Sequence, residues 1–295
     1  MYGLIVLSVV MFGGCFALKD IYRQKRGEGL MISLEFSLVA ALAGAVVLFI
    51  INAANGIFWE FTPFAFLMAA LSALNGFGFT FCSFKALGKI NLSLYSLFSM
   101  LGGMLLPFLQ GLIFYGEKMT VAKGVCFALI TAALLLAVKW KSIGKSGKKS
   151  GVIYYIGVFA LNGMSGVLSK IFTSAPAEMQ TGATSYSLLS ALISAFVSVI
   201  LLLALGRRMG YTKTNPIACT VAAASGTVNR LANLFLVIAL ASGVDNTVQY
   251  PMVTGGVMIV STLIAFFGKN KPSRTEVASI AIAFLGTLAL FVIPI

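Results

Sequence analysis

One arginine lies deep inside an apolar stretch, where a charged side chain is expensive. Arg230 is far from Pro216 on one side and from Asp245 on the other. If this stretch crosses a bilayer, a charge at its centre costs about 2.5–3.5 kcal/mol on insertion scales. A guanidinium held there can bind a carboxylate or a phosphate through two parallel hydrogen bonds. Two structural alternatives stay open, namely an ion pair with Glu35 and hydrogen bonds to helix carbonyls.

Amide and hydroxyl side chains accompany this arginine. Asn229 is its neighbour, Asn233 follows about one helical turn later, and Asn75 takes the matching position of an earlier apolar stretch. Such groups can bind a ligand or join helices through hydrogen bonds. Four further polar residues lie early in two other apolar stretches: Tyr95, Ser99, Gln249 and Tyr250. We predict that these residues together line a substrate cavity, although helix joining is favoured for each asparagine alone and ordinary packing for each tyrosine alone.

One carboxylate lies inside an apolar stretch close to a basic cluster. Glu35 follows a basic cluster and stands about one turn into the next apolar stretch. Its carboxyl group could carry a coupling proton, because desolvation favours the protonated form. It could instead reach back to the interface or pair with a lysine. The second reading is favoured, because side chains near a helix end reach the interface easily.

Two prolines lie close to glycine pairs inside apolar stretches. Each proline removes a backbone hydrogen bond, so the helix can bend there and a freed carbonyl can face a cavity. A static kink explains the pattern equally well. The predicted hinge residues are Pro107 with Gly102 and Gly103, and Pro251 with Gly255 and Gly256.

The sequence lacks the residues that most catalytic and metal sites use. It has no histidine, and its four cysteines stand singly in apolar runs without a CxxC pair. No HExxH, GxSxG or GxxxxGK[ST] motif occurs. We therefore predict that the chain is not an enzyme and that it has no metal site and no cofactor.

The elements that must position these residues are long apolar segments. Of the 295 residues, 59% are hydrophobic and 10% are charged, and the mean hydropathy is +1.00. A soluble domain carries about 25% charged residues. The net charge is +13, but the basic residues are scattered over short loops, so we predict no nucleic-acid partner. The segments must be helical, because lipid offers no partner for an open backbone polar group.

Ten segments approach the roughly 20 residues that a membrane-spanning helix needs. No Lys or Arg precedes the first segment, as a signal peptide would require, so we expect that segment to stay in the protein. The ten predicted spans are 2–18, 31–52, 63–85, 91–115, 120–139, 151–171, 183–205, 215–240, 246–267 and 275–294.

Most of the 21 Lys and Arg residues fall in every second gap between these segments. The fifth gap holds Lys145, Lys148 and Lys149, for example, whereas even-numbered gaps hold Glu60 and Glu117. Basic residues in short loops stay on the cytoplasmic side during insertion. We therefore predict a plasma (inner) membrane protein whose odd-numbered loops are cytoplasmic and whose two termini lie outside.

The fifth gap is also a linker between two similar halves. It divides the chain into a first five-helix repeat over 1–140, a basic linker over 141–150 and a second five-helix repeat over 151–295. Short strings recur in order at nearly one spacing: Gly102-Gly103 returns as Gly255-Gly256, and Ala86-Leu87 as Ala239-Leu240. An odd number of helices makes the second copy enter the membrane upside down. The sequence thus predicts an all-α polytopic membrane protein with ten transmembrane helices in two inverted five-helix repeats, an architecture suited to transport.

A short motif then indicates a family. Leu106-Pro107-Phe108-Leu109, followed by Gly116-Glu117-Lys118 and Gly124, resembles the fourth-to-fifth helix signature of the EamA-like branch of the drug/metabolite transporter superfamily. The five-plus-five layout of that branch matches the whole chain. In the second half, Gly268-Lys269-Asn270 replaces the Gly-Glu-basic pattern. The smaller four-helix relatives couple protons through a first-helix glutamate, which the first segment here does not contain.

The resemblance implies a secondary transporter or facilitator, often an exporter, with a central cavity between the halves. It implies alternating access for a small polar or amphipathic metabolite. The expected partners are that small-molecule substrate and the lipid bilayer. A flippase for a lipid-linked substrate would share the architecture and is the alternative.

Overall fold

The computed structural model describes residues 2–56, 61–116, 119–137, 152–209, 215–241, 246–268 and 271–293. Within these ranges the chain forms ten α-helices and one short 3-10 helix, η1 (Ala177–Met179), and no strand. Each predicted segment contains one helix. The helices are α1 (Tyr2–Arg26), α2 (Leu30–Ala54), α3 (Pro63–Leu87), α4 (Leu92–Phe114), α5 (Val121–Ala137), α7 (Val152–Thr173), α8 (Ala183–Met209), α9 (Pro216–Ala241), α10 (Asn246–Phe267) and α11 (Arg274–Val292). The predicted linker, 141–150, lies outside the described residues.

Local capping explains several helix starts. The Thr62 side chain accepts a hydrogen bond from the Ala65 amide, and the Asn91 side chain accepts one from the Leu94 amide at 2.8 Å. α11 begins with a capping box, in which the Ser273 side chain and the Glu276 carboxylate each bond the other residue's backbone amide. These bonds satisfy amides that the first helical turn leaves open.

α1 extends past the predicted end at residue 18 and continues to Arg26. Its buried side chains recur every three or four residues, and Lys19 and Tyr22 continue the pattern set by Cys15. The predicted end at residue 18 is the point where the apolar run meets the first basic residues. The helix itself continues for as long as one of its faces packs against neighbouring helices. Lys19 is therefore part of a helix and not of the first loop.

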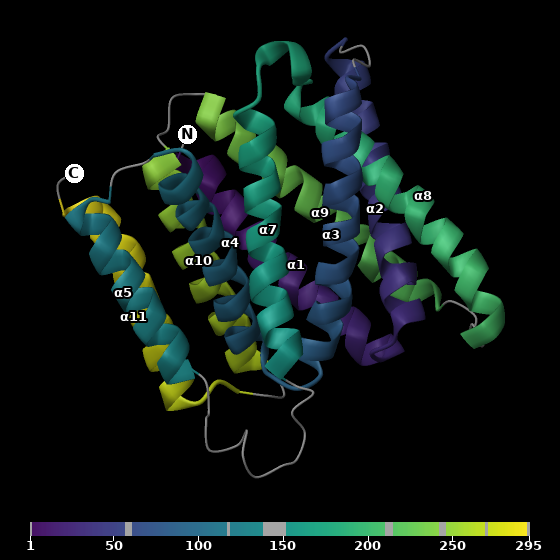
Figure 1. Ribbon diagram of the computed structural model, residues 1–295. Coiled ribbons are helices and arrows are strands. Elements are labelled where there is room, and N and C mark those ends of the chain that lie inside the picture. The colour runs from purple at the N-terminus through teal and green to yellow at the C-terminus, as the bar shows by residue number, and fades with distance from the viewer. Residues whose placement is uncertain are drawn as a thin grey trace.

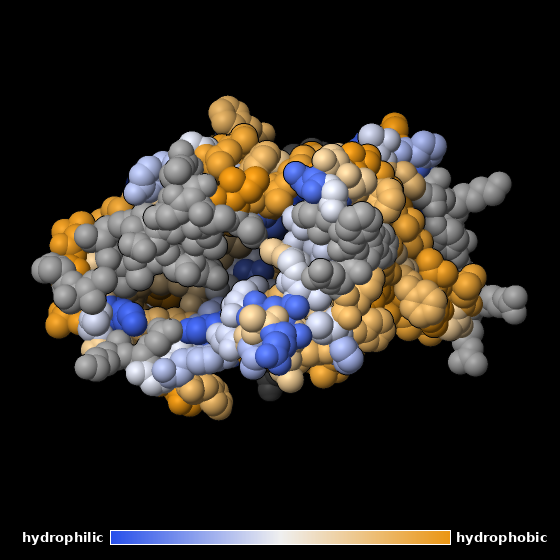
Figure 2. Space-filling view, turned by 90° about the horizontal axis from the view of Figure 1, so that it is seen from above, coloured by the Kyte–Doolittle hydropathy of each residue, from blue (hydrophilic) through white to orange (hydrophobic). Residues whose placement is uncertain are grey.

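In the described part of the chain, six helices are long and apolar enough to cross a membrane: α1, α2, α3, α4, α7 and the helical segment 177–206, which covers most of α8. Their outward faces carry large apolar side chains, such as Phe196 at 66% and Leu203 at 71% exposure on α8. Orange surface covers much of both flanks in Figure 2. A soluble monomer rarely exposes apolar surface on this scale, so the faces fit a lipid environment.

The helices form one bundle in which the two halves of the sequence interleave (Figure 1). α1 packs against α9 and α10, whereas α7 packs against α3 and α4. α2 packs against α8 and α9, and α3 also meets α8. α4 meets α10, and α5 pairs with α11 at one edge of the bundle. The contacts between the halves are more extensive than those within each half.

The two ends of the bundle differ. The turns at 27–29, 88–91 and 271–273 lie at one end, together with Arg23, Lys25 and Arg26 of α1. We name it the basic end. Both chain termini and the connection from α7 to α8 lie at the opposite end, which we name the terminal end (Figure 1).

The predicted hinge glycines lie where helices touch. A Cβ added to Gly102 would lie 2.0 Å from the Phe159 carbonyl oxygen of α7, and one added to Gly103 would meet the Asn162 amide nitrogen. Gly255 faces α11 and Gly256 faces Val9 of α1. Pro107 lies inside α4, and the side chain of Pro251 lies outside the described residues. The glycines permit close helix contact, and bending at these sites stays a prediction.

Candidate functional site

Arg230 lies on the face of α9 that meets α2. Gly226, one turn earlier on α9, approaches the Ala40 backbone so closely that an added Cβ would lie 2.1 Å from the Ala40 carbonyl oxygen. The arginine side chain then passes over Gly44, where an added Cβ would lie 2.8 Å from its Cγ atom. Two glycines, one on each helix, therefore give the arginine its position.

The structure removes the predicted ion pair as an explanation for this charge. Glu35 binds Arg26 instead, with 2.6 Å between its Oε2 atom and the Arg26 Nη2 atom. The alternative of an Arg230–Glu35 pair is therefore wrong. Among the described residues, Arg230 makes no hydrogen bond and no ion pair, although its side chain is only partly exposed.

A tyrosine on α8 lies within electrostatic range of Arg230. Tyr186 is in electrostatic contact with the guanidinium. Its hydroxyl lies 2.8 Å from the Ser72 hydroxyl on α3, and its ring stacks on Phe172 of α7 with 4.0 Å between centroids. A cation, two hydroxyls and an aromatic wall thus come together from α9, α3, α8 and α7. Tyr186 and Ser72 were not among the predicted site residues, because nothing in their local sequence indicates which helix they face.

The predicted asparagines lie in two different parts of the bundle. Asn229 and Asn233 stay beside the arginine, and the Asn233 amide donates to the Asn229 carbonyl at 2.8 Å. Asn75 is buried on α3 and joins that helix to α7, where it donates to the Leu161 carbonyl at 2.9 Å and to the Ser165 hydroxyl at 2.7 Å. The second arrangement is the helix-joining role that was favoured for each asparagine alone.

The predicted α4 residues lie in helix contacts. The Tyr95 hydroxyl is fully buried and lies 2.8 Å from the Ser83 hydroxyl of α3. Ser99 is also fully buried, and its carbonyl accepts a hydrogen bond from Asn162 of α7 at 2.6 Å. Their role in lining a cavity stays a prediction. The side chains of the two α10 residues, Gln249 and Tyr250, lie outside the described residues.

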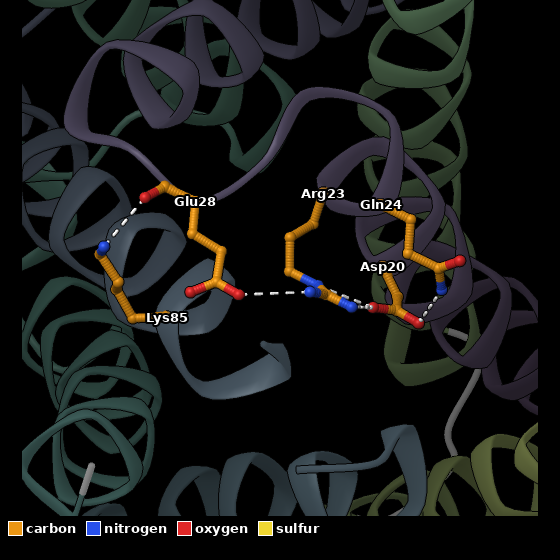
Figure 3. A network of polar contacts seen from close by, with 5 residues as sticks. All are labelled: Asp20, Arg23, Gln24, Glu28 and Lys85. Carbon is orange, nitrogen blue, oxygen red and sulfur yellow. Dashed lines mark hydrogen bonds and ion pairs between the residues drawn. The ribbon is translucent and has the colours of Figure 1, made fainter. Parts of the chain in front are cut away.

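An ionic network ties three helices together at the basic end (Figure 3). Arg23 binds Asp20 at 2.8 Å and Glu28 at 3.3 Å, which links α1 to the turn before α2. Lys85 at the end of α3 donates to the Glu28 carbonyl at 2.9 Å. Gln24 also donates to Asp20. In this structure, α1, α2 and α3 are therefore held together at the basic end.

A second ion pair, Arg26–Glu35, joins the last turn of α1 to α2. Their side chains are 11% and 4% exposed, and the Tyr22 hydroxyl lies close to both. Glu35 was expected to reach the interface or to pair with a lysine, but it is buried and pairs with Arg26. A buried pair of this kind is costly to break, because the remaining charge loses its partner. A coupling role for Glu35 stays a prediction.

The described residues contain no group of three or more His, Cys, Asp or Glu side chains that could hold a metal ion. The four cysteines are free thiols. Within the part of the chain that the structure describes, the site consists of one cation without an ion pair and with hydroxyl and aromatic neighbours, which suits the binding of an anion through hydrogen bonds and charge.

Comparisons with known proteins bear on the fold. No family model matches the sequence, and no curated protein matches it. A solved structure, described as "Crystal structure of protein", superposes with a TM-score of 0.58 at 18% sequence identity. The match covers 97% of this chain and 94% of that one. The two chains share a fold. The same helical arrangement therefore tolerates extensive sequence change over almost its whole length.

Proposed function

We propose that this chain is a secondary transporter that moves a small organic anion across a membrane by alternating access between its two halves. The observation that carries the proposal is Arg230, a cation inside the bundle with no hydrogen bond or ion pair among the described residues. Intramembrane charges are rare and normally mark a substrate or ion pathway. A carboxylate or phosphate group would supply the two-pronged partner that the guanidinium lacks.

The packing of the helices supports an inverted repeat. If the halves are exchanged, α1 takes the place of α7, α2 of α8, α3 of α9, α4 of α10 and α5 of α11. The α1–α9 contact then becomes the α7–α3 contact, and α1–α10 becomes α7–α4, both of which occur. Likewise α2–α9 becomes α8–α3, while α2–α8, α4–α10 and α5–α11 map onto themselves. This symmetry is the one expected of two copies related by a twofold axis, and such copies can exchange conformations.

The charge distribution supports an orientation. The described turns of the basic end are flanked by Arg23, Lys85, Lys89 and Arg274. Under the positive-inside rule this end is cytoplasmic and the terminal end faces outward. The ionic network then lies on the cytoplasmic side, where it joins α1, the turn before α2 and α3. Seen from the terminal end, the molecule is hollowed between its flanks, with hydrophilic surface in the recess (Figure 2).

Cysteine labelling in intact cells tests this orientation. We expect Ser146→Cys and Thr212→Cys, both in odd-numbered loops, to react with a membrane-impermeant maleimide only after permeabilisation. Ser174→Cys, at an exposed position of the terminal end, is the matched control and should react without it. The unmodified protein gives the background from its four native cysteines. Labelling of either loop position from outside contradicts the proposed topology.

Binding and flux measurements on the purified protein test the function. The probes are succinate for carboxylates and glycerol 3-phosphate for phosphate monoesters, with glycerol and putrescine as neutral and cationic controls. We expect at least one anion to raise the unfolding temperature and to enter proteoliposomes, since a ligand present at 100 times its Kd stabilises by about 2.7 kcal/mol. The absence of binding and of uptake for both anions contradicts the proposal. Translocation of a fluorescent lipid in the same vesicles would instead support the flippase alternative.

A further inference from the structure

A second cation is buried between α1, α2 and α3. Lys19 is only 8% exposed. Its Nζ atom lies 4.5 Å from the centroid of the Phe79 ring and 5.9 Å from that of Phe36. Among the described residues it makes no hydrogen bond and no ion pair. Ring contacts to a desolvated ammonium are worth about 2 kcal/mol or more, whereas taking the charge out of water costs several kcal/mol.

Lys19 and Arg230 lie along the same helix faces. On α3, Ser72 is beside the Tyr186–Arg230 group and Phe79, two turns later, is beside Lys19. On α2, Gly44 contacts Arg230 and Phe36, two turns earlier, contacts Lys19. Because residues two turns apart share one face of a helix, both cations border the same interior region.

The register of α1 against α9 gives their separation. The Ser8 hydroxyl donates to the Ala232 carbonyl at 3.0 Å, and the Cys15 thiol donates to the Ser225 carbonyl at 3.5 Å. These antiparallel contacts place Lys19 level with residue 221 of α9. Arg230 is therefore about 13 Å further toward the terminal end, at 1.5 Å per residue.

The described acidic residues are engaged elsewhere. Asp20 and Glu28 bind Arg23, and Glu35 binds Arg26. Glu276 belongs to the α11 capping box, and Glu178 lies in the exposed 3-10 helix. In the described part of the chain, no carboxylate is thus placed to neutralise either interior cation. The region is positive, and an anion entering it would lower the electrostatic energy of both charges.

We infer that Lys19 is a second binding station for the carboxylate or phosphate group that Arg230 binds, placed on the basic-end side of Arg230. The inference rests on the proposed transport function. The two backbone positions are offset by about 13 Å along the bundle, so the two cations can bind the anionic group one after the other. Arg230 is partly exposed here, whereas Lys19 is buried against the Phe79 and Phe36 rings on the basic-end side. Lys19 therefore receives the anion when the basic end opens.

The test separates binding from transport. We expect Lys19→Met to keep the rise in unfolding temperature that succinate or glycerol 3-phosphate produces from the open side, because Arg230 is intact. Uptake of the same anion should fall by about 30-fold or more, because the second cation that draws the anion inward is missing. Lys19→Arg should restore part of the uptake, because it restores the charge. Lys19→Gln gives a second neutral variant if the methionine variant folds poorly.

Lys170→Met is the matched control. Lys170 takes the corresponding position on α7, near the terminal end, with its Nζ atom 5.0 Å from the Tyr115 ring centroid. This variant should transport nearly as the unmodified protein does.

Wild-type uptake by the neutral Lys19 variants overturns the inference and leaves the transport proposal intact. A joint loss of binding and uptake that Lys19→Arg does not restore also overturns it, because it indicates a structural role. If the unmodified protein neither binds nor transports either anion, both the inference and the transport proposal fail.

Discussion

Replacing Arg230 with methionine is expected to abolish the binding and uptake of succinate and glycerol 3-phosphate while the bundle still folds. The guanidinium has no partner among the described residues, so its removal leaves no other buried group unpaired. Its insertion cost of about 2.5–3.5 kcal/mol disappears, and thermal stability should stay equal or rise. The anion loses charge-assisted hydrogen bonds worth about 1.5–3 kcal/mol each, so two such bonds amount to a loss in affinity of 100-fold or more.

A short series of variants makes the Arg230 result specific. Arg230→Lys keeps the charge but loses the two-pronged geometry, so it should bind weakly and transport slowly. Arg274→Met removes an exposed arginine at the start of α11 and should behave as the unmodified protein. Unfolding temperature, anion-induced stabilisation and proteoliposome uptake are measured on all of them. A misfolded Arg230→Met protein would indicate a structural arginine, and unchanged uptake would place Arg230 outside the site.

Replacing Gly226 with valine is expected to prevent the bundle from folding properly. Even the first side-chain atom, a Cβ added at this position, would lie 2.1 Å from the carbonyl oxygen of Ala40 and 2.6 Å from its carbonyl carbon. Both atoms belong to the backbone, so α2 and α9 must move apart to make room. Overpacking of a tight core costs about 1–3 kcal/mol, and a branched side chain against backbone lies at or above the top of that range. The same movement would withdraw Gly44 from Arg230 and disrupt the candidate site.

Gly76→Val on α3 is the control for this substitution. Gly76 also lies inside a helix, but a Cβ added there meets no atom within 4 Å. The two variants share the change in side chain and differ in the space available. Thermal unfolding in detergent and the yield of monodisperse protein compare them. Equal behaviour of Gly226→Val and Gly76→Val would contradict the close contact between α2 and α9.

The helices could be predicted from sequence because their cause is local. A segment of about 20 apolar residues must form its own backbone hydrogen bonds in lipid, whatever its neighbours are. Each predicted segment therefore contains a helix, and most ends agree to within a few residues. α1 is the exception, since tertiary contacts to Lys19 and Tyr22 extend it beyond its apolar run to Arg26.

The candidate site could be predicted only in part. The position of Arg230 inside an apolar stretch marked it as exceptional, because the cost of burying a charge follows from the sequence alone. The hydroxyl neighbours could not be found in this way. Ser72 and Tyr186 are more than a hundred residues apart and meet only because α3 and α8 pack together.

The sequence by itself determined that the chain is a helical bundle with its basic residues concentrated at one end, because helix formation and hydropathy depend on residues close together along the chain. Only the tertiary structure decided which cations have partners. It joined Arg26 to Glu35, enclosed Lys19 under Phe79 and left Arg230 beside Gly44. Charge pairing depends on distances of a few ångströms between helix faces, and long-range packing sets those distances.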